Sequence, residues 1–392
     1  MCKNSLIVGI GLLFLTLFKA NAQDIIPAAH RVDQYLPLLQ NKTIGIVANH
    51  SSLIKETHVV DSLLKLDVDI KYIFSPEHGF RGNADAGKYI LNSVDSLTGL
   101  PVISLYGRNK KPANQHLKEI DLMVFDLQDV GVRFYTYIST LHYVMEACAE
   151  NGTPLLLLDR PNPNGYYVDG PVLDTSYSSF VGLHPIPIVY GLTIGELAGM
   201  INGEGWIDKY CDLTVIKCLD YDHDDMYDLP VAPSPNLPNM QSVYLYPSLG
   251  LFEGTVMSVG RGTHFPFQVY GHPEYNDEDF YFVPLPSKGA SDPKYKGLKC
   301  YGLNLDDLIQ LGRETSGVKP EYLKDAYLKT KTDNFFNSFF KLLVGNEELQ
   351  KQIESGMSVK QIKESWKPDL VKFREKRKRY LLYEDFEEIT ND

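Results

Sequence analysis

Short apolar runs alternate with amphipathic segments between Thr43 and Pro163, and this alternation limits the fold more than any other feature of the sequence. The apolar runs lie at 43–48, 70–74, 101–105, 122–125 and 154–158, and segments of helical character such as 59–66 and 137–148 lie between them. Short strands separated by helices imply right-handed crossover connections. The pattern therefore predicts a parallel sheet covered by helices.

The predicted fold class is α/β, with a Rossmann-like parallel-sheet domain at the N-terminus. No Gly-x-Gly-x-x-Gly motif follows the first apolar run, so we expect no nucleotide or other cofactor. Beyond Gly165 the alternation is less regular, and a chain of 392 residues exceeds what one hydrophobic core usually serves. We expect a Rossmann-like catalytic domain at 23–185 and a smaller α+β C-terminal domain at 186–392 that completes the cleft. Within the second domain, Thr193 is expected to cap a helix together with Glu196.

The first residues have the features of a signal peptide. Lys3 precedes an apolar run at 6–18, and Ala-Asn-Ala at 20–22 has the small residues that signal peptidase requires. The run is too short to span a bilayer comfortably, and no later stretch is long enough to do so. We therefore expect a signal peptide at 1–22, cleavage near Ala22, and a periplasmic or secreted protein without a membrane span.

The charge and the cysteines exclude several functions. The net charge is −12, and cleavage would make it more negative by removing Lys3 and Lys19. Broad binding to nucleic acid or to an anionic lipid surface is therefore not expected. The cysteines that remain have no zinc or redox spacing; they are Cys148, Cys211, Cys218 and Cys300. Cys211 and Cys218 are the nearest pair for a disulfide, although a core of this size does not need one.

Polar clusters follow three of the apolar runs. They occupy 75–82, 126–133 and 159–165, directly after the second, fourth and fifth runs. Open parallel sheets bind ligands outside the carboxyl ends of their strands, and loops with several charges on a rigid scaffold often carry function. Further along the chain, the glycines around Arg261 suggest a backbone held close to a ligand. These features predict an active site at one edge of the sheet.

Paired carboxylates in an exported protein suggest glycoside hydrolysis. One carboxyl group must give a proton to the leaving oxygen, while a second stabilises the sugar cation, traps it or activates water. Glu77 is the best candidate for the acid because it follows Pro76 at a predicted strand end. Asp129 is the best candidate for the second group. Asp126 is the next, although it could instead cap a helix or pair with Arg133.

Three arginines could bind an anionic substituent of the substrate. Arg133, Arg160 and Arg261 each offer a planar fork of donors that matches a carboxylate. The alternative is that they form structural ion pairs with Asp126, Asp159 or Glu253.

At these residues the chain resembles the exo-β-N-acetylmuramidase family. The resemblance rests on Ser-Pro-Glu-His-Gly-Phe-Arg-Gly at 75–82, Asp-Leu-Gln-Asp-Val-Gly-Val-Arg-Phe-Tyr-Thr-Tyr at 126–137, Asp-Arg-Pro-Asn-Pro at 159–163, Pro-Ser-Pro-Asn-Leu-Pro at 233–238, and Glu-Gly-Thr with Gly-Arg-Gly-Thr within 253–263. It covers essentially the whole chain after the signal peptide. It implies release of N-acetylmuramic acid from the non-reducing ends of peptidoglycan fragments, and a site between a Rossmann-like domain and a smaller second domain.

The resemblance also implies roles for individual residues. The glutamate of the first motif is Glu77, the expected catalytic acid, and Asp129 remains our choice for the second group. The motif residues expected to bind muramic acid glycans are His78, Arg81, Asp126, Arg133, Tyr137, Asp159, Arg160, Asn162, Glu253, Arg261 and Thr263. The chain has Tyr190 where the family pattern has a histidine before Gly-x-Thr-x-Gly-Glu. Muramic acid carries a lactyl carboxylate that glucosamine lacks, so an arginine could distinguish the two sugars.

Two other functions fit parts of the sequence. A periplasmic protein that captures cell-wall sugars without cleaving them would keep the aromatic residues and arginines but would not need Glu77. A metal-dependent hydrolase would need His78 to converge on a metal with Asp126 or Asp159. No pair of histidines has the spacing of a zinc helix, so we expect no metal.

Overall fold

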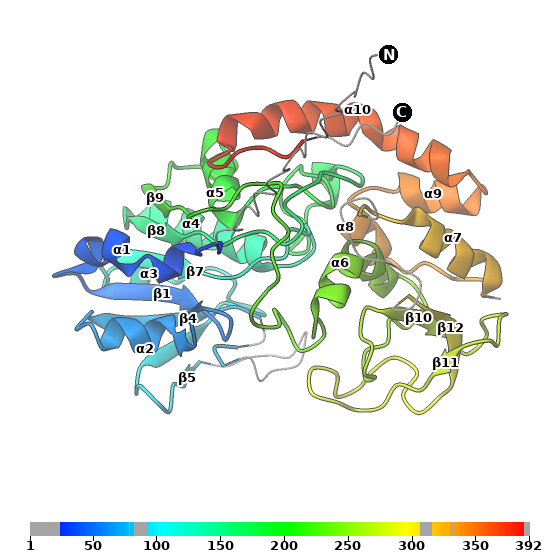
Figure 1. Cartoon of the computed structure of the whole chain (residues 1–392), viewed down its shortest axis with the longest axis horizontal. Coiled ribbons are helices and arrows are strands. Elements are labelled where there is room, and N and C mark those ends of the chain that lie inside the picture. Colours follow the sequence, from blue (N-terminus) through cyan, green and yellow to red (C-terminus); the bar gives the residue numbers. More distant parts are fainter. Residues whose placement is uncertain (1–23, 78, 82–91, 306–315, 331, 388–392) are drawn as a thin grey trace, which may run out of the picture.

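The protein has an α/β fold, as the sequence predicts (Figure 1). The computed structural model describes residues 24–77, 79–81, 92–305, 316–330 and 332–387. Its central sheet has seven strands in the order β5-β6-β4-β1-β7-β8-β9, parallel except for the short edge strand β5, which runs antiparallel to β6. The strands are β1 Ile44–Ala48, β4 Ile70–Ser75, β5 Ser93–Val94, β6 Pro101–Ser104, β7 Leu122–Asp126, β8 Leu155–Leu158 and β9 Leu213–Ile216.

The five predicted apolar runs form β1, β4, β6, β7 and β8, and they are apolar because the sheet is covered on both faces. Successive side chains of a strand point to opposite faces. Ile44 and Ile46 of β1 therefore join a core cluster with α1 and α2, whereas Val47 joins the cluster with α3, α4 and α5. These helices are α1 Val32–Leu39, α2 Val59–Leu64, α3 Asn114–Leu117, α4 Tyr137–Asn151 and α5 Ile194–Gly203. A small hairpin of β2 Leu53–Ile54 and β3 Thr57–His58 precedes α2.

We call this sheet and its helices the first lobe. Its last strand, β9, comes from residues 213–216, after a long connection through α5. The predicted domain boundary between residues 185 and 186 stays a prediction. The predicted helix cap is confirmed: the Thr193 side chain accepts from the Glu196 amide at 3.2 Å, and Glu196 accepts from the Thr193 amide at 2.8 Å.

The second lobe combines helices with a small antiparallel sheet (Figure 1). Its elements are α6 Met240–Leu249, the 3₁₀ helix η3 Gly250–Gly254, the sheet strands β10 Val269–His272, β11 Tyr281–Phe282 and β12 Cys300–Asn304, and the helices α7 Pro320–Lys329, α8 Phe340–Val344 and α9 Glu348–Glu354. One hydrophobic cluster runs from the α4 face of the sheet into this lobe, where Phe252 and Phe340 are fully buried. The two lobes therefore share a continuous core.

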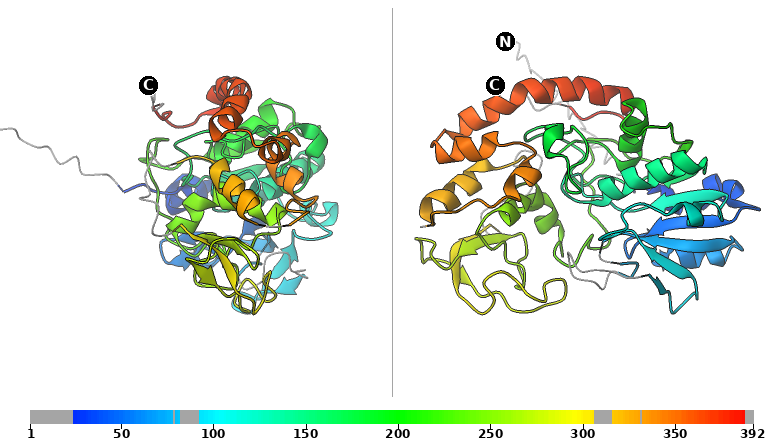
Figure 2. Two further views of the ribbon diagram at one scale, coloured as in Figure 1. Left: turned by 90° about the vertical axis from the view of Figure 1, so that its right-hand side faces the viewer. Right: turned by 180° about the vertical axis from the view of Figure 1, so that it is seen from behind.

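The C-terminal helix α10, Val359–Arg377, arches over both lobes (Figure 2). After it, the chain returns to the first lobe and forms hydrogen bonds with a residue that follows β8 and with a residue of α5. We call residues 380–387 the C-terminal tail. Tyr383 donates to Asp159 at 2.6 Å, and the Leu382 amide donates to Glu196 at 2.8 Å. The tail thus ties the end of the chain to the first lobe.

The expected signal peptide at 1–22 lies outside the described residues. In the part of the chain that the structure describes, no helix combines the length and apolar character needed to cross a membrane. The four cysteines after residue 22 are buried free thiols, so Cys211 and Cys218 are not joined.

Candidate active site

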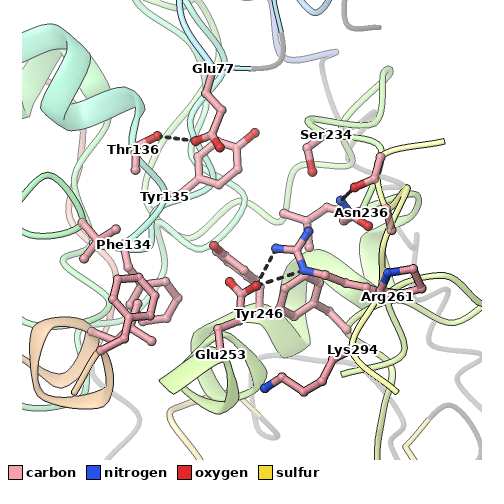
Figure 3. Close-up of a pocket in the computed structure, with 18 of the residues that line it drawn as sticks. Glu77, Phe134, Tyr135, Thr136, Ser234, Asn236, Tyr246, Glu253, Arg261 and Lys294 are labelled. Atoms are coloured by element: carbon pink, nitrogen blue, oxygen red, sulfur yellow. Dashed lines mark hydrogen bonds and ion pairs between the residues drawn. The ribbon is translucent and has the colours of Figure 1, made fainter. Parts of the chain in front are cut away.

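A pocket of about 550 Å³ lies between the two lobes, on the side of the sheet where its parallel strands end (Figure 3). The first lobe contributes Glu77 after β4, Tyr106 after β6 and the segment 134–137 after β7. The other lining residues are Phe180, Val181, Ser234, Asn236, Leu237, Tyr246, Glu253, Arg261, Phe267, Gly289, Ala290, Ser291, Asp292, Pro293, Lys294, Phe339 and Leu343. This is the position at which open α/β sheets bind ligands, and the volume suits a small molecule.

Glu77 is held at the upper wall of the pocket. It follows Pro76, just beyond the end of β4, and the Thr136 hydroxyl donates to its Oε2 at 3.1 Å (Figure 3). Thr136 is the residue before the first turn of α4, so the start of this helix positions the carboxylate. The pKa of Tyr106 is raised first by burial and then by the charge of Glu77 and a hydrogen bond to it. Glu77 therefore has two hydroxyl neighbours from the first lobe.

Tyrosine rings line the pocket below Glu77. The Tyr135 hydroxyl donates to the Pro233 carbonyl at 2.8 Å, and the Tyr137 hydroxyl accepts from the Asn49 amide at 2.7 Å. The two rings pack edge to face with centroids 4.7 Å apart. The Tyr135 bond joins the segment after β7 to the proline-rich loop 233–238, which lines the opposite side.

Glu253 and Arg261 form the charged wall of the second lobe. Arg261 donates to Glu253 Oε1 from Nε at 2.9 Å and from Nη2 at 2.7 Å. Figure 3 shows the Arg261 guanidinium lying between Glu253 and Asn236. Lys294 donates to the Thr255 and Met257 carbonyls at 2.7 and 3.0 Å, and burial lowers its pKa. The pocket thus has a carboxylate and two cations opposite Glu77.

Asp129 is not one of the pocket-lining residues among those described. It is only 4% exposed and lies behind Tyr135 and Tyr137, whose pKa values its charge helps to raise. Its Oδ2 accepts from the Gly131 amide at 2.7 Å and from the Tyr190 hydroxyl, and its Oδ1 has no hydrogen-bond partner in the described structure. Burial raises the pKa of Asp129 to about 6. Tyr190, which stands where the family pattern has a histidine, is thus a buried donor to this carboxyl group.

The loop that carries Asp129 depends on Gly131. Gly131 has a φ of +74°, and a Cβ on it would lie 2.2 Å from Oδ1 of Asn162. Asn162 itself donates to the Leu192 carbonyl and accepts from the Asn164 amide, each at 2.8 Å. Asn162 therefore packs this loop against the start of α5 and does not line the pocket.

The remaining arginine candidates form structural bonds. Arg160 donates to Asp126 through Nε and Nη2 at 2.6 and 2.9 Å, and both side chains are almost fully buried. Arg81 forms a similar pair with Asp95 at 3.0 and 2.8 Å. The alternative of a structural ion pair is thus correct for Arg160, with Asp126 as its partner.

Arg133 is fully buried and bonds to backbone carbonyls. Its Nη1 donates to Pro171 and Ile186 at 2.8 and 2.6 Å, and its Nη2 donates to Leu343 and Val344 at 2.9 and 2.6 Å. Burial lowers its pKa to about 9. Arg133 therefore connects the loop after β7 to α8 of the second lobe, beside the pocket rather than in it.

Asp159 and Thr263 also form local bonds. Asp159 is buried with a pKa raised to about 6 by burial, and it accepts from Thr193, Gly195 and Tyr383. The Thr263 hydroxyl donates to the Gly260 carbonyl at 2.6 Å and closes a turn. Both residues hold loops that lead to the pocket.

His78 lies outside the described residues. Its proposed partners at a metal have other partners in the structure. Asp126 accepts from Arg160, and Asp159 accepts from the Thr193 hydroxyl. Over the ranges that the structure describes, no group of three or more His, Cys, Asp or Glu side chains converges as metal ligands would.

The structure therefore brings four of the candidates into one pocket: Glu77, Tyr137, Glu253 and Arg261. Sequence reasoning did not select Tyr106, Thr136, Asn236, Tyr246 or Lys294, which also line it. A signal existed for three of them. Tyr106 directly follows a predicted strand, Thr136 lies within the motif at 126–137, and Asn236 lies within the motif at 233–238.

The chain is similar to known proteins over nearly all of its length. The family models "Exo-beta-N-acetylmuramidase NamZ, N-terminal" and "C-terminal" match residues 44–241 and 244–383. A peptidoglycan beta-N-acetylmuramidase NamZ of Bacillus subtilis (strain 168) is 41% identical over an alignment of 383 residues, and the match covers 89% of this chain and 89% of that protein.

Two solved structures have the same fold. Both are DUF1343 family proteins of Bacteroides fragilis NCTC 9343. One is 48% identical, with a TM-score of 0.86 over 93% of this chain and 100% of its own. The other is 28% identical, with a TM-score of 0.77 over 92% of this chain and 99% of its own.

Proposed function

The chain belongs to the exo-β-N-acetylmuramidase family, and from that premise we propose how its pocket performs the reaction. The protein is a glycoside hydrolase, an exo-acting β-N-acetylmuramidase of peptidoglycan. Its substrate carries N-acetylmuramic acid at the non-reducing end. One water molecule is consumed for each muramic acid released.

Glu77 is the general acid in this proposal. The proton of its carboxyl group passes to the glycosidic oxygen as the bond to the terminal sugar breaks. Thr136 fixes the orientation of the carboxyl group with a 3.1 Å hydrogen bond. The supporting observation is that Glu77 lines one wall of a pocket whose opposite wall carries a second carboxylate.

Glu253 is the second carboxylate that the geometry favours. It lines the pocket, whereas Asp129 is buried behind two tyrosine rings. Arg261 donates two hydrogen bonds to Oε1 of Glu253 and so holds that oxygen in place. Such a carboxylate can stabilise the sugar cation or activate water. The earlier choice of Asp129 stays a prediction that substitution can test.

The lactyl carboxylate of the terminal sugar has two cations within reach in the same pocket. Arg261 and Lys294 both line it, whereas Arg133 and Arg160 are bonded elsewhere. A sugar that lacks the lactyl group offers Arg261 and Lys294 no carboxylate to attract and should therefore bind more weakly. Discrimination against a terminal glucosamine follows.

The site is proposed to work outside the cytoplasm. Lys3, the apolar run at 6–18 and Ala-Asn-Ala at 20–22 support a signal peptide with cleavage near Ala22. The mature enzyme would then act in the periplasm or as a secreted protein, where peptidoglycan fragments arise.

The test is release of muramic acid from the disaccharide in which N-acetylmuramic acid is β-1,4-linked to N-acetylglucosamine. Glu77→Gln keeps the shape and removes the proton source, so its rate should fall at least about 100-fold. The rate of muramic acid release by Glu253→Gln should fall by a similar factor. Asp292→Asn is a matched control, because Asp292 lies at the pocket but its side chain is 86% exposed.

The outcomes separate the possible functions. Binding of the disaccharide without cleavage by wild type would support the alternative of a capture protein. Full activity of Glu77→Gln would place the acid elsewhere. Full activity of Glu253→Gln with a large loss in Asp129→Asn would return the second role to Asp129.

A further inference from the structure

A pair of parallel aromatic rings leads out of the pocket beside Glu77. Phe180 lines the pocket, and the ring of Tyr143, on α4, lies nearly parallel to it, with an interplanar angle of 19° and centroids 6.3 Å apart. Rings stacked face to face would have centroids about 4 Å apart. The two rings are therefore offset from each other, and we call this pair of rings the aromatic platform.

The platform is held rigidly. Phe180 and Val181 form the tip of a two-residue turn that is closed by Ser179 and Gly182, whose amides and carbonyls bond to each other at 2.9 and 3.0 Å. The Ser139 hydroxyl of α4 donates to the Phe180 carbonyl at 2.7 Å. A turn fixed at both sides presents its side chain at little entropic cost on binding.

One face of the Phe180 ring is already covered. The Lys110 ammonium lies 4.2 Å from the ring centroid, and Lys110 is not among the pocket-lining residues of the described chain. Lys110 therefore packs against the Phe180 ring without lining the pocket itself. Phe180 lines the pocket, so part of its ring is within reach of a ligand there.

The platform is linked to the proposed acid through Tyr106. The centroids of Tyr106 and Phe180 are 6.3 Å apart, and the Tyr106 hydroxyl is a hydrogen-bond neighbour of Glu77. Phe180 therefore lies beside the tyrosine that neighbours the acid, in the same pocket wall. Tyr143 is half-buried and outside the pocket lining, so the platform continues from the pocket toward solvent.

We infer that the platform binds the sugar on the leaving side of the scissile bond, the N-acetylglucosamine that follows the terminal muramic acid. This inference rests on the proposed function. An exo-acting enzyme encloses the terminal sugar and lets the rest of the glycan run outward, and the platform runs outward. The C–H face of a pyranose is apolar and matches an aromatic ring. The charged wall of Glu253 and Arg261 is then left to the terminal sugar.

The experiment compares two substrates that differ on the leaving side alone. One is the muramic acid–glucosamine disaccharide, and the other is the methyl β-glycoside of N-acetylmuramic acid. Phe180→Ala should lower kcat/KM for the disaccharide about 10-fold or more and for the methyl glycoside less than about 2-fold. Phe180→Trp should retain the preference for the disaccharide. Tyr281→Ala removes a half-exposed ring of β11 outside the pocket and serves as the control.

An equal loss on both substrates in Phe180→Ala would overturn the inference, as would no loss on either. If wild type cleaves neither substrate, the proposed function fails, and binding of free N-acetylglucosamine decides the platform separately. Loss of its saturation-transfer NMR signal in Phe180→Ala would support the platform. An unchanged signal, or none with wild type, would overturn it.

Discussion

Replacing Asp129 with asparagine should change how the stability of the protein depends on pH. Asp129 is 4% exposed, and burial raises its pKa from 3.8 to about 6. The folded state therefore holds this proton more tightly than the unfolded state does. The stability that the protonated group contributes is complete below pH 3.8 and is lost as the pH rises through about 6.

The size of the effect follows from the pKa shift. A shift of about 2 pH units corresponds to about 3 kcal/mol in the free energy of unfolding, and about 2 kcal/mol of this falls between pH 4 and pH 7.5. Asparagine has the same shape and does not ionise. Its amide would leave one buried N–H without a partner, which costs about 1 to 3 kcal/mol at every pH. The difference between Asp129→Asn and wild type should therefore move in favour of the variant as the pH rises.

Urea unfolding of both proteins from pH 4 to pH 7.5 measures this difference. Asp159, whose pKa is also raised to about 6, is present in both proteins and cancels. A difference that stays constant over this range would refute the reasoning. Activity on the disaccharide tests the catalytic role with the same variant, because loss of a second catalytic group should lower the rate at least about 100-fold.

Other substitutions test the bonds around the pocket. Arg160→Met leaves Asp126 charged and buried without its partner and should lower the free energy of unfolding by about 3 to 5 kcal/mol, measured in urea; adding Asp126→Asn should recover most of the loss. Gly131→Ala meets Asn162 at 2.2 Å and a φ of +74°, so its melting temperature should fall, and an unchanged value would contradict the geometry. Arg261→Lys keeps the charge but cannot form the same pair of hydrogen bonds to Glu253, so kcat/KM should fall about 10-fold or more while the melting temperature changes little.

The sheet was predictable because its strands are covered on both faces. Each of β1, β4, β6, β7 and β8 is a continuous apolar run in the sequence. The second lobe gave no comparable pattern. Its sheet is short, and its strand β11 has two residues, of which Tyr281 is half-exposed. Such a strand depends on its neighbour β12 rather than on its own sequence.

The candidate site was predictable to the level of loops but not of every side chain. Asp126 ends β7, and Arg160 lies in the loop after the adjacent strand β8. Their contact therefore follows from the order of the strands in the sheet. The hydrogen bonds of Arg133 do not follow from the order of the strands. Two of them reach Leu343 and Val344, more than 200 positions away, and no local signal marks a backbone carbonyl as a partner. A buried arginine and a pocket arginine look alike in sequence.

The return of the C-terminal tail to the first lobe sets the order in which the protein can be completed. Tyr383 bonds to Asp159 across 224 positions of the chain. A ribosome adding about 5 to 20 residues per second needs roughly 10 to 45 s to cover that separation. Throughout this interval the ribosome has already made Asp159, which follows β8, but has not yet made Tyr383, which donates to its buried carboxyl group. The first lobe therefore lacks this hydrogen bond until the last residues of the chain have been made.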